Sequence, residues 1–203
     1  MTKEQEKVWD NIAEEWHELK TQDKEKQGQH VLNFLEGKKG KILDLGSGSG
    51  RYLRNVKEGK MYLSDFSGEM INLAKEKAKK EKINAEFSVA EMTKLPYEND
   101  FFDYAIASSS FHCLNPEEQK ESVKELFRVL KKGGEAEISV WNIESSRFKN
   151  SPKEKMIKWH DKGARYYYLF SPEEIYSLFE KAGFKIIEKE QPRMMIVFTV
   201  KKA

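Results

Sequence analysis

Three glycines and two aspartates near residue 50 carry the clearest chemical pattern in the chain. Residues 42–50 read ILDLGSGSG, an apolar run that contains an acid and then breaks into alternate glycines: Asp44, Gly46, Gly48 and Gly50. Such a run is typical of a buried parallel strand. The glycines are typical of a tight turn that brings backbone close to a ligand. Asp65 ends the next apolar run, 19 residues after Gly46. A carboxylate at that strand tip can accept hydrogen bonds from ribose hydroxyls, so the pattern predicts an adenosine-containing cofactor.

The spacing of the glycines bears on which cofactor is bound. A dinucleotide fold reads G-x-G-x-x-G, whereas this loop reads G-x-G-x-G and follows Asp44. A carboxylate at this place disfavours a pyrophosphate and suits a cationic ligand, such as the sulfonium and ammonium end of S-adenosylmethionine. The segment DLGSGSG followed by Asp65 resembles the cofactor site of class I methyltransferases, and the resemblance implies S-adenosylmethionine as cofactor. The alternative is a strand-to-helix turn that uses glycine for packing only.

Composition indicates one soluble α/β domain over residues 1–203. The chain is 38% hydrophobic and 34% charged, with a formal net charge of +2. That charge neither indicates nucleic-acid binding nor excludes a local basic patch. No apolar stretch approaches the ~20 residues that span a bilayer, and the first residues lack a signal-peptide core. The single cysteine, Cys113, excludes an internal disulfide and a Cys-rich zinc site. We therefore expect a cytoplasmic protein with no metal site and no membrane association.

The order of the expected elements indicates the fold class. Helices are expected at 3–20, 28–36, 51–57, about 68–82 (capped by Ser67), from Asn115–Pro116 to Gly133–Gly134, and from Ser171–Pro172 to Gly183. Strands are expected at 41–45, 60–64, 85–89, 102–108 and 135–141, with a closing hairpin of 184–190 and 194–201. This order predicts an α/β, doubly wound, mostly parallel seven-stranded Rossmann-like sheet with a C-terminal antiparallel hairpin. Residues 1–36 are expected to form an N-terminal helical lid, and 142–170 a substrate-side insertion.

Further cofactor contacts follow from position at the carboxyl ends of the strands. By analogy with class I methyltransferases, Glu91 would bond the adenine amino group and Met92 would offer a backbone or apolar contact. Ser108 ends the fourth strand near the methionine moiety. Ser47 in the glycine loop and Phe66 after Asp65 complete the expected cofactor set. The alternatives are a solvated loop acid at Glu91 and a merely polar loop at the serines.

Some methyl acceptors can be set aside. Methylation of an exocyclic base amine commonly uses an N-P-P-Y-like tetrad after the fourth strand, where this chain has residues 109–112, SSFH. Cytosine C5 chemistry needs a Pro-Cys nucleophile, but Cys113 follows His112. Cys113 is best interpreted as a small packing residue.

A series of segments resembles one methyltransferase family over nearly the whole chain: VWDNIAEEW at 8–16, GRYL at 50–53, FHCL at 111–114, VW at 140–141, Lys158–Trp159 and RYYYLF at 165–170. That family esterifies the carboxylate of 5-carboxymethyluridine at the wobble position of tRNA. The resemblance implies the tRNA anticodon loop as substrate and a small zinc-ribbon activator protein as partner. The chain departs from the family at Ser47 and Ser49 (usually Cys and Asn), Phe66 (often Arg), Cys113 (usually His) and Lys20 (Arg).

A carboxylate acceptor is already ionised at neutral pH, so its methylation needs alignment and no general base. Lys20 and Arg165 could hold the anion, and His112 could bond one of its oxygens. Tyr166, with Trp9 and Trp16, could close over the cofactor or stack on a base. Each residue has an alternative: the tryptophans as a helix core face, the tyrosine as packing, His112 as a capping residue, and Arg165 as a surface ion pair.

Two further expectations concern partners. Basic residues in the variable segments could form a phosphate-facing rim: Lys20, Lys24, Lys26, Lys149, Lys153, Lys155, Lys158, Lys162 and Arg165. Ile106, Phe111 and Leu114 could contact an activator if some of them are exposed. Two rival functions remain: a small-molecule methyltransferase acting on a carboxylate, quinone or phenol, and a catalytically silent cofactor-binding subunit of an RNA-modifying assembly.

Overall fold

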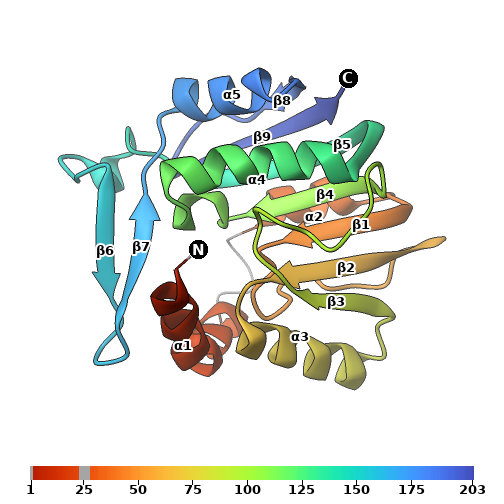
Figure 1. Ribbon diagram of the computed structural model, residues 1–203, viewed down its shortest axis with the longest axis horizontal. Coiled ribbons are helices and arrows are strands. Elements are labelled where there is room, and N and C mark those ends of the chain that lie inside the picture. The colour runs from red at the N-terminus through yellow and green to blue at the C-terminus, as the bar shows by residue number, and fades with distance from the viewer. Residues whose placement is uncertain (1, 23–27) are drawn as a thin grey trace.

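A seven-stranded sheet forms the centre of the computed structural model, which describes residues 2–22 and 28–203 (Figure 1). Its strand order is β3-β2-β1-β4-β5-β9-β8. The strands are β1 (Gly40–Leu45), β2 (Gly59–Asp65), β3 (Ala85–Val89), β4 (Phe102–Ser108), β5 (Leu130–Trp141), β8 (Phe184–Lys189) and β9 (Met195–Lys202). β1 to β5 pair in parallel, while β9 is antiparallel to β5 and to β8. The predicted doubly wound sheet with a closing hairpin is confirmed.

Helices cover both faces of this sheet. They are α1 (Lys3–Gln22), α2 (Gln29–Leu35), α3 (Gly68–Glu81), α4 (Pro116–Val129) and α5 (Pro172–Lys181). Buried residues of α4 and α5 form one core with β1, β4, β5 and β9, and those of α2 and α3 form a second core with β1 and β2. α1 packs on α3 and on the 142–170 segment through a third, aromatic cluster. None of the helices in the described ranges is long and apolar enough to cross a membrane.

The predicted helix caps are present. The Ser67 side chain accepts a hydrogen bond from Met70 N at the start of α3, at 3.1 Å. At α4, Asn115 accepts from the Glu118 backbone N–H while the Glu118 carboxylate accepts from Asn115 N, which is a full capping box. Each cap satisfies N–H groups that have no partner inside the helix.

Two expected helix positions are wrong. Residues 51–57 form turns and extended backbone instead of a helix. Lys77 donates to the carbonyls of Gly50 and Arg51, at 2.7 and 3.4 Å, so these carbonyls are bonded from outside the segment. α4 ends at Val129 rather than at the glycine pair, because the fully buried Leu130 is extended and already pairs with β4. Gly133 and Gly134 therefore lie inside β5.

The 142–170 segment holds a separate two-stranded sheet. After a short 3₁₀ turn, η2 (Ser146–Phe148), β6 (Glu154–Lys158) and β7 (Ala164–Tyr168) pair antiparallel and stand beside α1 (Figure 1). Gln5 of α1 donates to Ala164 O at 3.0 Å and accepts from Tyr166 N at 2.9 Å. Because alternate residues of a strand face opposite sides, Arg165 and Tyr167 share one face and Tyr166 takes the other.

Replacing Asn115 with alanine removes the α4 capping box. We expect Asn115→Ala to lower the free energy of unfolding by about 1 kcal/mol, because the first-turn N–H groups lose their acceptor. Urea denaturation at neutral pH measures the change. Asn115→Asp keeps the acceptor oxygen and adds charge at the helix N-terminus, so it should retain wild-type stability. Equal stability of the alanine variant and the wild type would contradict the role given to the cap.

Candidate functional site

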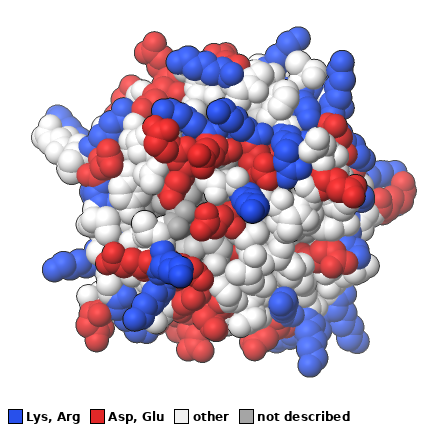
Figure 2. Space-filling view, in the orientation of Figure 1, with Lys and Arg blue, Asp and Glu red and all other residues white. Residues whose placement is uncertain are grey.

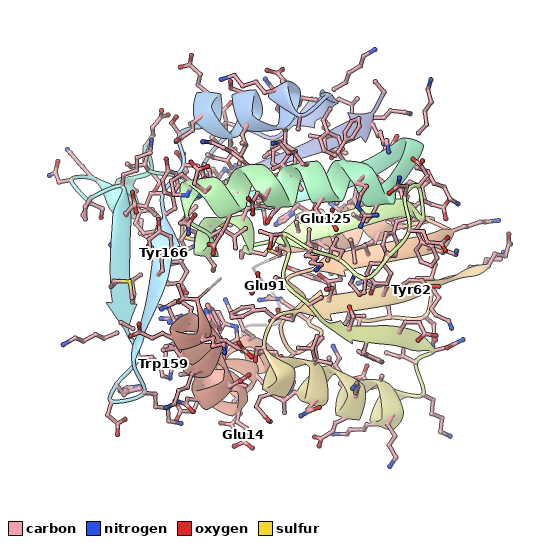
Figure 3. All side chains as sticks on the ribbon, in the orientation of Figure 1. Glu14, Tyr62, Glu91, Glu125, Trp159 and Tyr166 are labelled. Atoms are coloured by element: carbon pink, nitrogen blue, oxygen red, sulfur yellow. The ribbon has the colours of Figure 1, made fainter. Side chains whose placement is uncertain are left out.

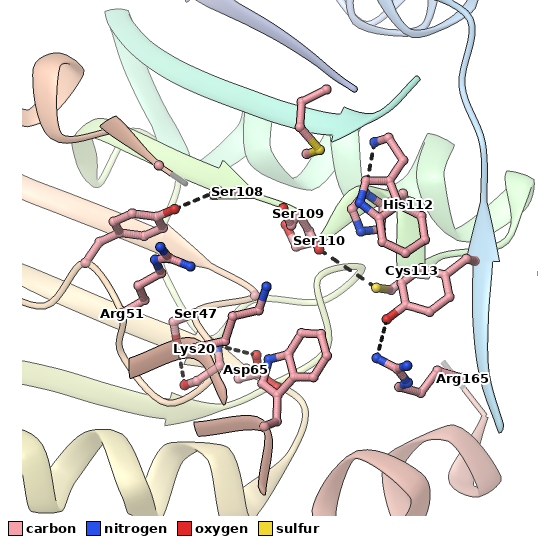
Figure 4. Close-up of a pocket in the computed structure, with 18 of the residues that line it drawn as sticks. Lys20, Ser47, Arg51, Asp65, Ser108, Ser109, Ser110, His112, Cys113 and Arg165 are labelled. Carbon is pink, nitrogen blue, oxygen red and sulfur yellow. Dashed lines mark hydrogen bonds between the residues drawn. The ribbon is translucent and has the colours of Figure 1, made fainter. Parts of the chain in front are cut away.

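A cavity of about 810 Å³ opens at the carboxyl ends of the parallel strands. Asp44 of β1, Asp65 of β2, Ser108 of β4 and Trp141 of β5 all line it, so it lies where open α/β sheets bind ligands (Figure 4). Side chains of α1 and of the β6–β7 hairpin also line the cavity. The cavity is thus bounded by the strand ends, α1 and the β6–β7 hairpin.

The glycine loop is held by Asp65. Its carboxylate accepts a hydrogen bond from Gly48 N at 2.8 Å and one from Ser67 N at 3.0 Å. Gly46 and Gly48 have φ of +71° and +51°, which glycine adopts without strain. A Cβ on Gly46 would also overlap the Ser110 side chain. Glycine is therefore favoured here for two reasons: the positive φ angles of the loop and the close approach of the Ser110 side chain to Gly46.

Asp44 is a buried acid that faces the cavity with one oxygen unused. It is 2% exposed, and its Oδ2 has no hydrogen-bond partner among the described residues. Burial raises the pKa of Asp44 to about 7, and the charge of Asp65 adds to the rise. Burial also raises the pKa of Asp65 to about 6, although backbone hydrogen bonds from Ser67 and Gly48 oppose this. Two desolvated carboxyls side by side suit a cationic ligand, which stabilises their ionised forms.

Other cavity residues also carry buried polar atoms without a partner in the described chain: Trp9 Nε1, Asp44 Oδ2, Ser110 Oγ and Arg165 Nε. Buried polar groups in native proteins are nearly always hydrogen-bonded, because an unmade bond leaves the desolvation penalty uncompensated. Their concentration around one cavity indicates that a polar ligand completes the site. This arrangement fits S-adenosylmethionine, which offers an ammonium group, a sulfonium and ribose hydroxyls.

Arg165 lines the cavity and lies inside an aromatic cage. Its guanidinium carbon is 4.7 to 5.6 Å from the ring centroids of Trp9, Trp16, Trp159 and Tyr167. It donates to the Tyr167 hydroxyl at 2.7 Å and is 5% exposed. No carboxylate in the described part of the chain pairs with it. The rings stabilise the cation while leaving its charge unneutralised.

His112 is a fixed hydrogen-bond donor. Its Nδ1 accepts from Trp141 N at 3.1 Å, and its ring stacks on the Trp141 ring with centroids 4.7 Å apart. Burial, with the nearby charge of Lys20, lowers its pKa to about 3, so the imidazole is neutral. A neutral imidazole that accepts at Nδ1 carries its proton on Nε2. His112 therefore has one N–H to offer, and it is not a base at neutral pH.

α1 contributes a positive charge and several polar contacts. Lys20 Nζ lies 4.7 Å from the centroid of the Trp16 ring and lines the cavity. His17 bonds Ser49 of the glycine loop at 2.8 Å, and Ser67 Oγ donates to Asp10 at 2.6 Å. α1 is thus bonded both to the glycine loop and to the start of α3.

Most of the residues predicted for the site line this cavity: Lys20, Asp44, Gly46, Ser47, Gly48, Asp65, Phe66, Met92, Ser108, His112 and Arg165. Gly50, Glu91 and Tyr166 do not (Figure 3). Gly50 faces Ala74 and Leu63 behind the loop, and Glu91 is exposed and accepts from Thr93. Tyr166 is on the outer face of the hairpin and donates to Glu154.

Sequence reasoning missed Tyr167, Trp141, Arg147 and Arg193, which line the cavity. For Tyr167 a signal was present, because residues i and i+2 of a strand share a face and Arg165 was already assigned. Arg147 and Arg193 lie in loops, where no periodicity predicts side-chain direction. Cys113 also lines the cavity, but burial raises its pKa to about 12, so the thiol stays protonated and is a poor nucleophile.

The structure does not support the residues expected to contact an activator, and it pairs two lysines of the expected basic rim with acids. Ile106, Phe111 and Leu114 are at most 1% exposed, so none of them can contact an activator. In the basic rim, Lys153 pairs with Glu174 at 2.9 Å and Lys162 with Glu15 at 2.6 Å. Lys24 and Lys26 lie outside the described residues. Figure 2 shows one face with both signs of charge interspersed.

Comparison with known proteins decides the domain type. A family model described as a methyltransferase domain matches residues 42–134. The match to a methyltransferase domain covers just under half of the chain. The solved structure of a Haloferax volcanii methyltransferase, in complex with the Trm112 methyltransferase activator, has a TM-score of 0.74 at 18% identity and covers 96% of this chain and 97% of its own. The fold is the class I methyltransferase fold. Solved structures described as SAM-dependent methyltransferases from Methanosarcina mazei and Clostridium acetobutylicum share it, at 20% and 15% identity with TM-scores of 0.69 and 0.66.

Two curated relatives are methyltransferases with different printed activities. The tRNA (carboxymethyluridine(34)-5-O)-methyltransferase alkbh8 of Xenopus tropicalis is 29% identical over 148 residues, which are 72% of this chain and 22% of that protein. The ubiquinone/menaquinone biosynthesis C-methyltransferase UbiE of Neisseria meningitidis is 31% identical over 110 residues, which are 51% of this chain and 44% of the relative. The chain spans less than half the length of either relative.

Cofactor affinity should depend on pH through Asp44 and Asp65. A cationic cofactor selects ionised carboxylates, but the pKa values of about 7 and about 6 leave both groups protonated at pH 5. We therefore expect affinity for S-adenosylmethionine to fall at least about tenfold from pH 7.5 to pH 5. Calorimetry in two buffers of different ionisation enthalpy would detect the proton released on binding.

Asp44→Asn is the matched control. It should bind the cofactor more weakly at pH 7.5 and show a shallower pH profile. Without ligand, folding stability depends on pH in the opposite direction to cofactor affinity. Because the folded-state pKa of Asp44 is above the unfolded value, the native state holds more protons. The contribution of Asp44 to stability is therefore lost as pH rises from about 4 to about 7. The unliganded Asn variant should therefore melt at a higher temperature than wild type at pH 7.5. A pH-independent wild-type affinity would refute the assignment.

Proposed function

We propose that the chain transfers the methyl group of S-adenosylmethionine to a carboxylate, and that this carboxylate belongs to 5-carboxymethyluridine at the tRNA wobble position. The observation that carries the proposal is Arg165, a buried cation that faces the cavity and has no acid partner in the described chain. An acceptor carboxylate would neutralise it. Arginine suits this task because its planar fork can grip both oxygens of a carboxylate.

In this proposal the two acids hold the cofactor. Asp44 takes its ammonium end, Asp65 its ribose hydroxyls, and the glycine loop lies against it at Gly46 and Gly48. Phe66 and Met92, which line the cavity beyond β2 and β3, flank the adenine. The bound cofactor supplies an electrophilic methyl group. The protein has to hold that group in line with the acceptor oxygen and keep water away.

The acceptor end works through charge and orientation. Arg165 and Lys20 hold the anion, and the Nε2–H of His112 donates to one of its oxygens. No proton has to be removed from an ionised carboxylate, which agrees with a histidine held neutral and already accepting at Nδ1. A phenol acceptor would need a general base, and His112 is not one at neutral pH. Orientation of this kind can supply ~7–11 kcal/mol of the barrier.

We further propose that α1 is a lid and that the 142–170 segment is the substrate-side insertion. Trp9, Trp16 and Trp159 from these two elements form a continuous aromatic wall, with centroids 5.3 and 5.6 Å apart between successive rings. A uracil base entering the cavity would meet this wall next to Arg165. Lys162 and Trp159 both bond Glu15, which ties the insertion to α1.

The relative from Xenopus tropicalis supports tRNA as the substrate class, and the Haloferax volcanii structure supports a small activator protein as partner. The relative from Neisseria supports the alternative, a small-molecule acceptor. A catalytically silent cofactor-binding subunit is the third possibility. Nucleoside mass spectrometry separates them: the protein is incubated with S-adenosylmethionine and tRNA bearing 5-carboxymethyluridine, with and without a zinc-ribbon activator. Gain of one methyl on that uridine supports the proposal, and absence of product in both mixtures refutes it.

Arg165 provides the sharpest mutational test. Arg165→Lys keeps the charge but loses the fork, so we expect kcat/KM for the tRNA to fall roughly tenfold to a hundredfold, or about 1.4–2.8 kcal/mol. Arg165→Met should lose more. Calorimetry should show unchanged cofactor affinity in both, because the proposal gives Arg165 no contact with the cofactor. Met156→Ala, on the exposed outer face of the same hairpin, is the control and should retain full turnover. Full activity of Arg165→Met would rule out an anion-binding role.

A further inference from the structure

Three cations gather around the end of β5, on the acceptor side of the cavity. Arg147 and Lys155 approach the Phe148 ring, with charged atoms 5.7 Å from its centroid in each case. Arg193 lies in the β8–β9 connection and lines the cavity, as Arg147 does. We call Arg147, Lys155 and Arg193 the β5-end cluster.

The fold brings the chain segments of Arg147 and Arg193 together. Phe148 is buried and packs on Trp141, the last residue of β5, with ring centroids 5.0 Å apart. Asn142 donates to Arg193 O at 2.9 Å, and its own N–H donates to Met194 O at 3.1 Å. Arg147 Nη1 in turn contacts Met194 Sδ at 3.5 Å. The loops that carry Arg147 and Arg193 are therefore joined at Asn142 and Met194.

The cluster also differs in charge balance from the surface lysines that form ion pairs. Many lysines of the described surface pair with a carboxylate: Lys38, Lys39, Lys60, Lys120, Lys131, Lys153, Lys162, Lys201 and Lys202. No described carboxylate pairs with Arg147, Lys155 or Arg193. The acids closest along the chain are Glu144, Glu154 and Glu190. None of them forms an ion pair with a cluster member within the described residues. The β5-end cluster is thus a local excess of positive charge in a molecule of net charge +2.

We propose that the β5-end cluster binds the phosphodiester groups that flank the methylated nucleoside. This inference rests on the proposed function, because it requires a nucleic-acid acceptor. Arg165 sits deep in the cavity and matches the single carboxylate of the acceptor, whereas Arg147 and Arg193 are exposed at its mouth. A nucleotide inserted base-first leaves its phosphates at the mouth. Two exposed arginines without acid partners suit phosphate oxygens, which they can bond in bidentate fashion.

The test uses the intact protein and a double variant, Arg147→Gln with Arg193→Gln. Binding of a fluorescent anticodon stem–loop RNA is measured by anisotropy from roughly 50 to 300 mM salt. Each lost phosphate contact should reduce the slope of log K against log salt by about 0.7–0.9, so the double variant should lose about 1.4–1.8. RNA affinity at the lower salt should fall roughly tenfold or more. Cofactor affinity should be unchanged.

A matched control removes the same charge elsewhere. Lys120→Gln with Lys153→Gln replaces two lysines that already pair with Glu117 and Glu174, so its salt slope should equal that of wild type. Free 5-carboxymethyluridine, which has no phosphate, is the second control. Its kcat/KM should be unchanged within about twofold in the arginine variant, because no phosphate contact is lost. The conservative Arg147→Lys with Arg193→Lys should restore most of the slope.

Each outcome has one meaning. A wild-type slope in the arginine variant, or wild-type protein that does not bind the RNA, overturns the cluster assignment. RNA binding with an arginine-dependent slope but without methyl transfer upholds the cluster and refutes the proposed function instead. Polyglutamate of matched charge should compete poorly. Equal competition would mean a surface for acidic proteins in general, and would overturn the phosphate assignment.

Discussion

The glycine loop and the helix start beside it depend on hydrogen bonds to the Asp65 carboxylate. It ends β2, accepts from Gly48 in the glycine loop and accepts from Ser67 at the start of α3. Ser67 then caps α3 and donates to Asp10 of α1. One buried acid thereby fixes the conformation of the glycine loop and the start of α3, and through Ser67 it also fixes the position of α1. Burial opposes its ionisation, so the arrangement is strained electrostatically until a suitable ligand is bound.

Charges of both signs line the cavity. Asp44 and Asp65 are buried acids, and Lys20 and Arg165 are cations. In the proposed reaction, a positively charged methyl donor would be drawn to the acids and a negatively charged acceptor to the cations. Methyl transfer would cancel the sulfonium charge of the donor and the carboxylate charge of the acceptor together, while the ammonium group of the spent cofactor would stay beside Asp44. Side chains fixed in advance can supply such a field without reorganising during the reaction.

The strands and the cofactor loop could be predicted because their signals are local. Apolar runs, alternate glycines and cap residues such as Ser67 and Asn115 each depend on a few neighbouring residues. The failures all involve contacts between distant segments. Lys77 bonds the carbonyls that a helix after Gly50 would have used, and the buried pairing of Leu130 ends α4 before the glycine pair. The register of the β6–β7 hairpin places Tyr166 on its outer face. The polar composition of residues 142–170 did not predict this hairpin.

The bonds of α1 have a kinetic consequence. α1 touches the glycine loop through His17, α3 through Asp10 and the hairpin through Glu15, and it supplies Trp9, Trp16 and Lys20 to the cavity wall. It cannot move away from the cofactor without also withdrawing part of the acceptor wall. In the proposed enzyme, exchange of spent cofactor and release of product would therefore be mechanically coupled, and an acceptor that remained bound would slow the replacement of the cofactor.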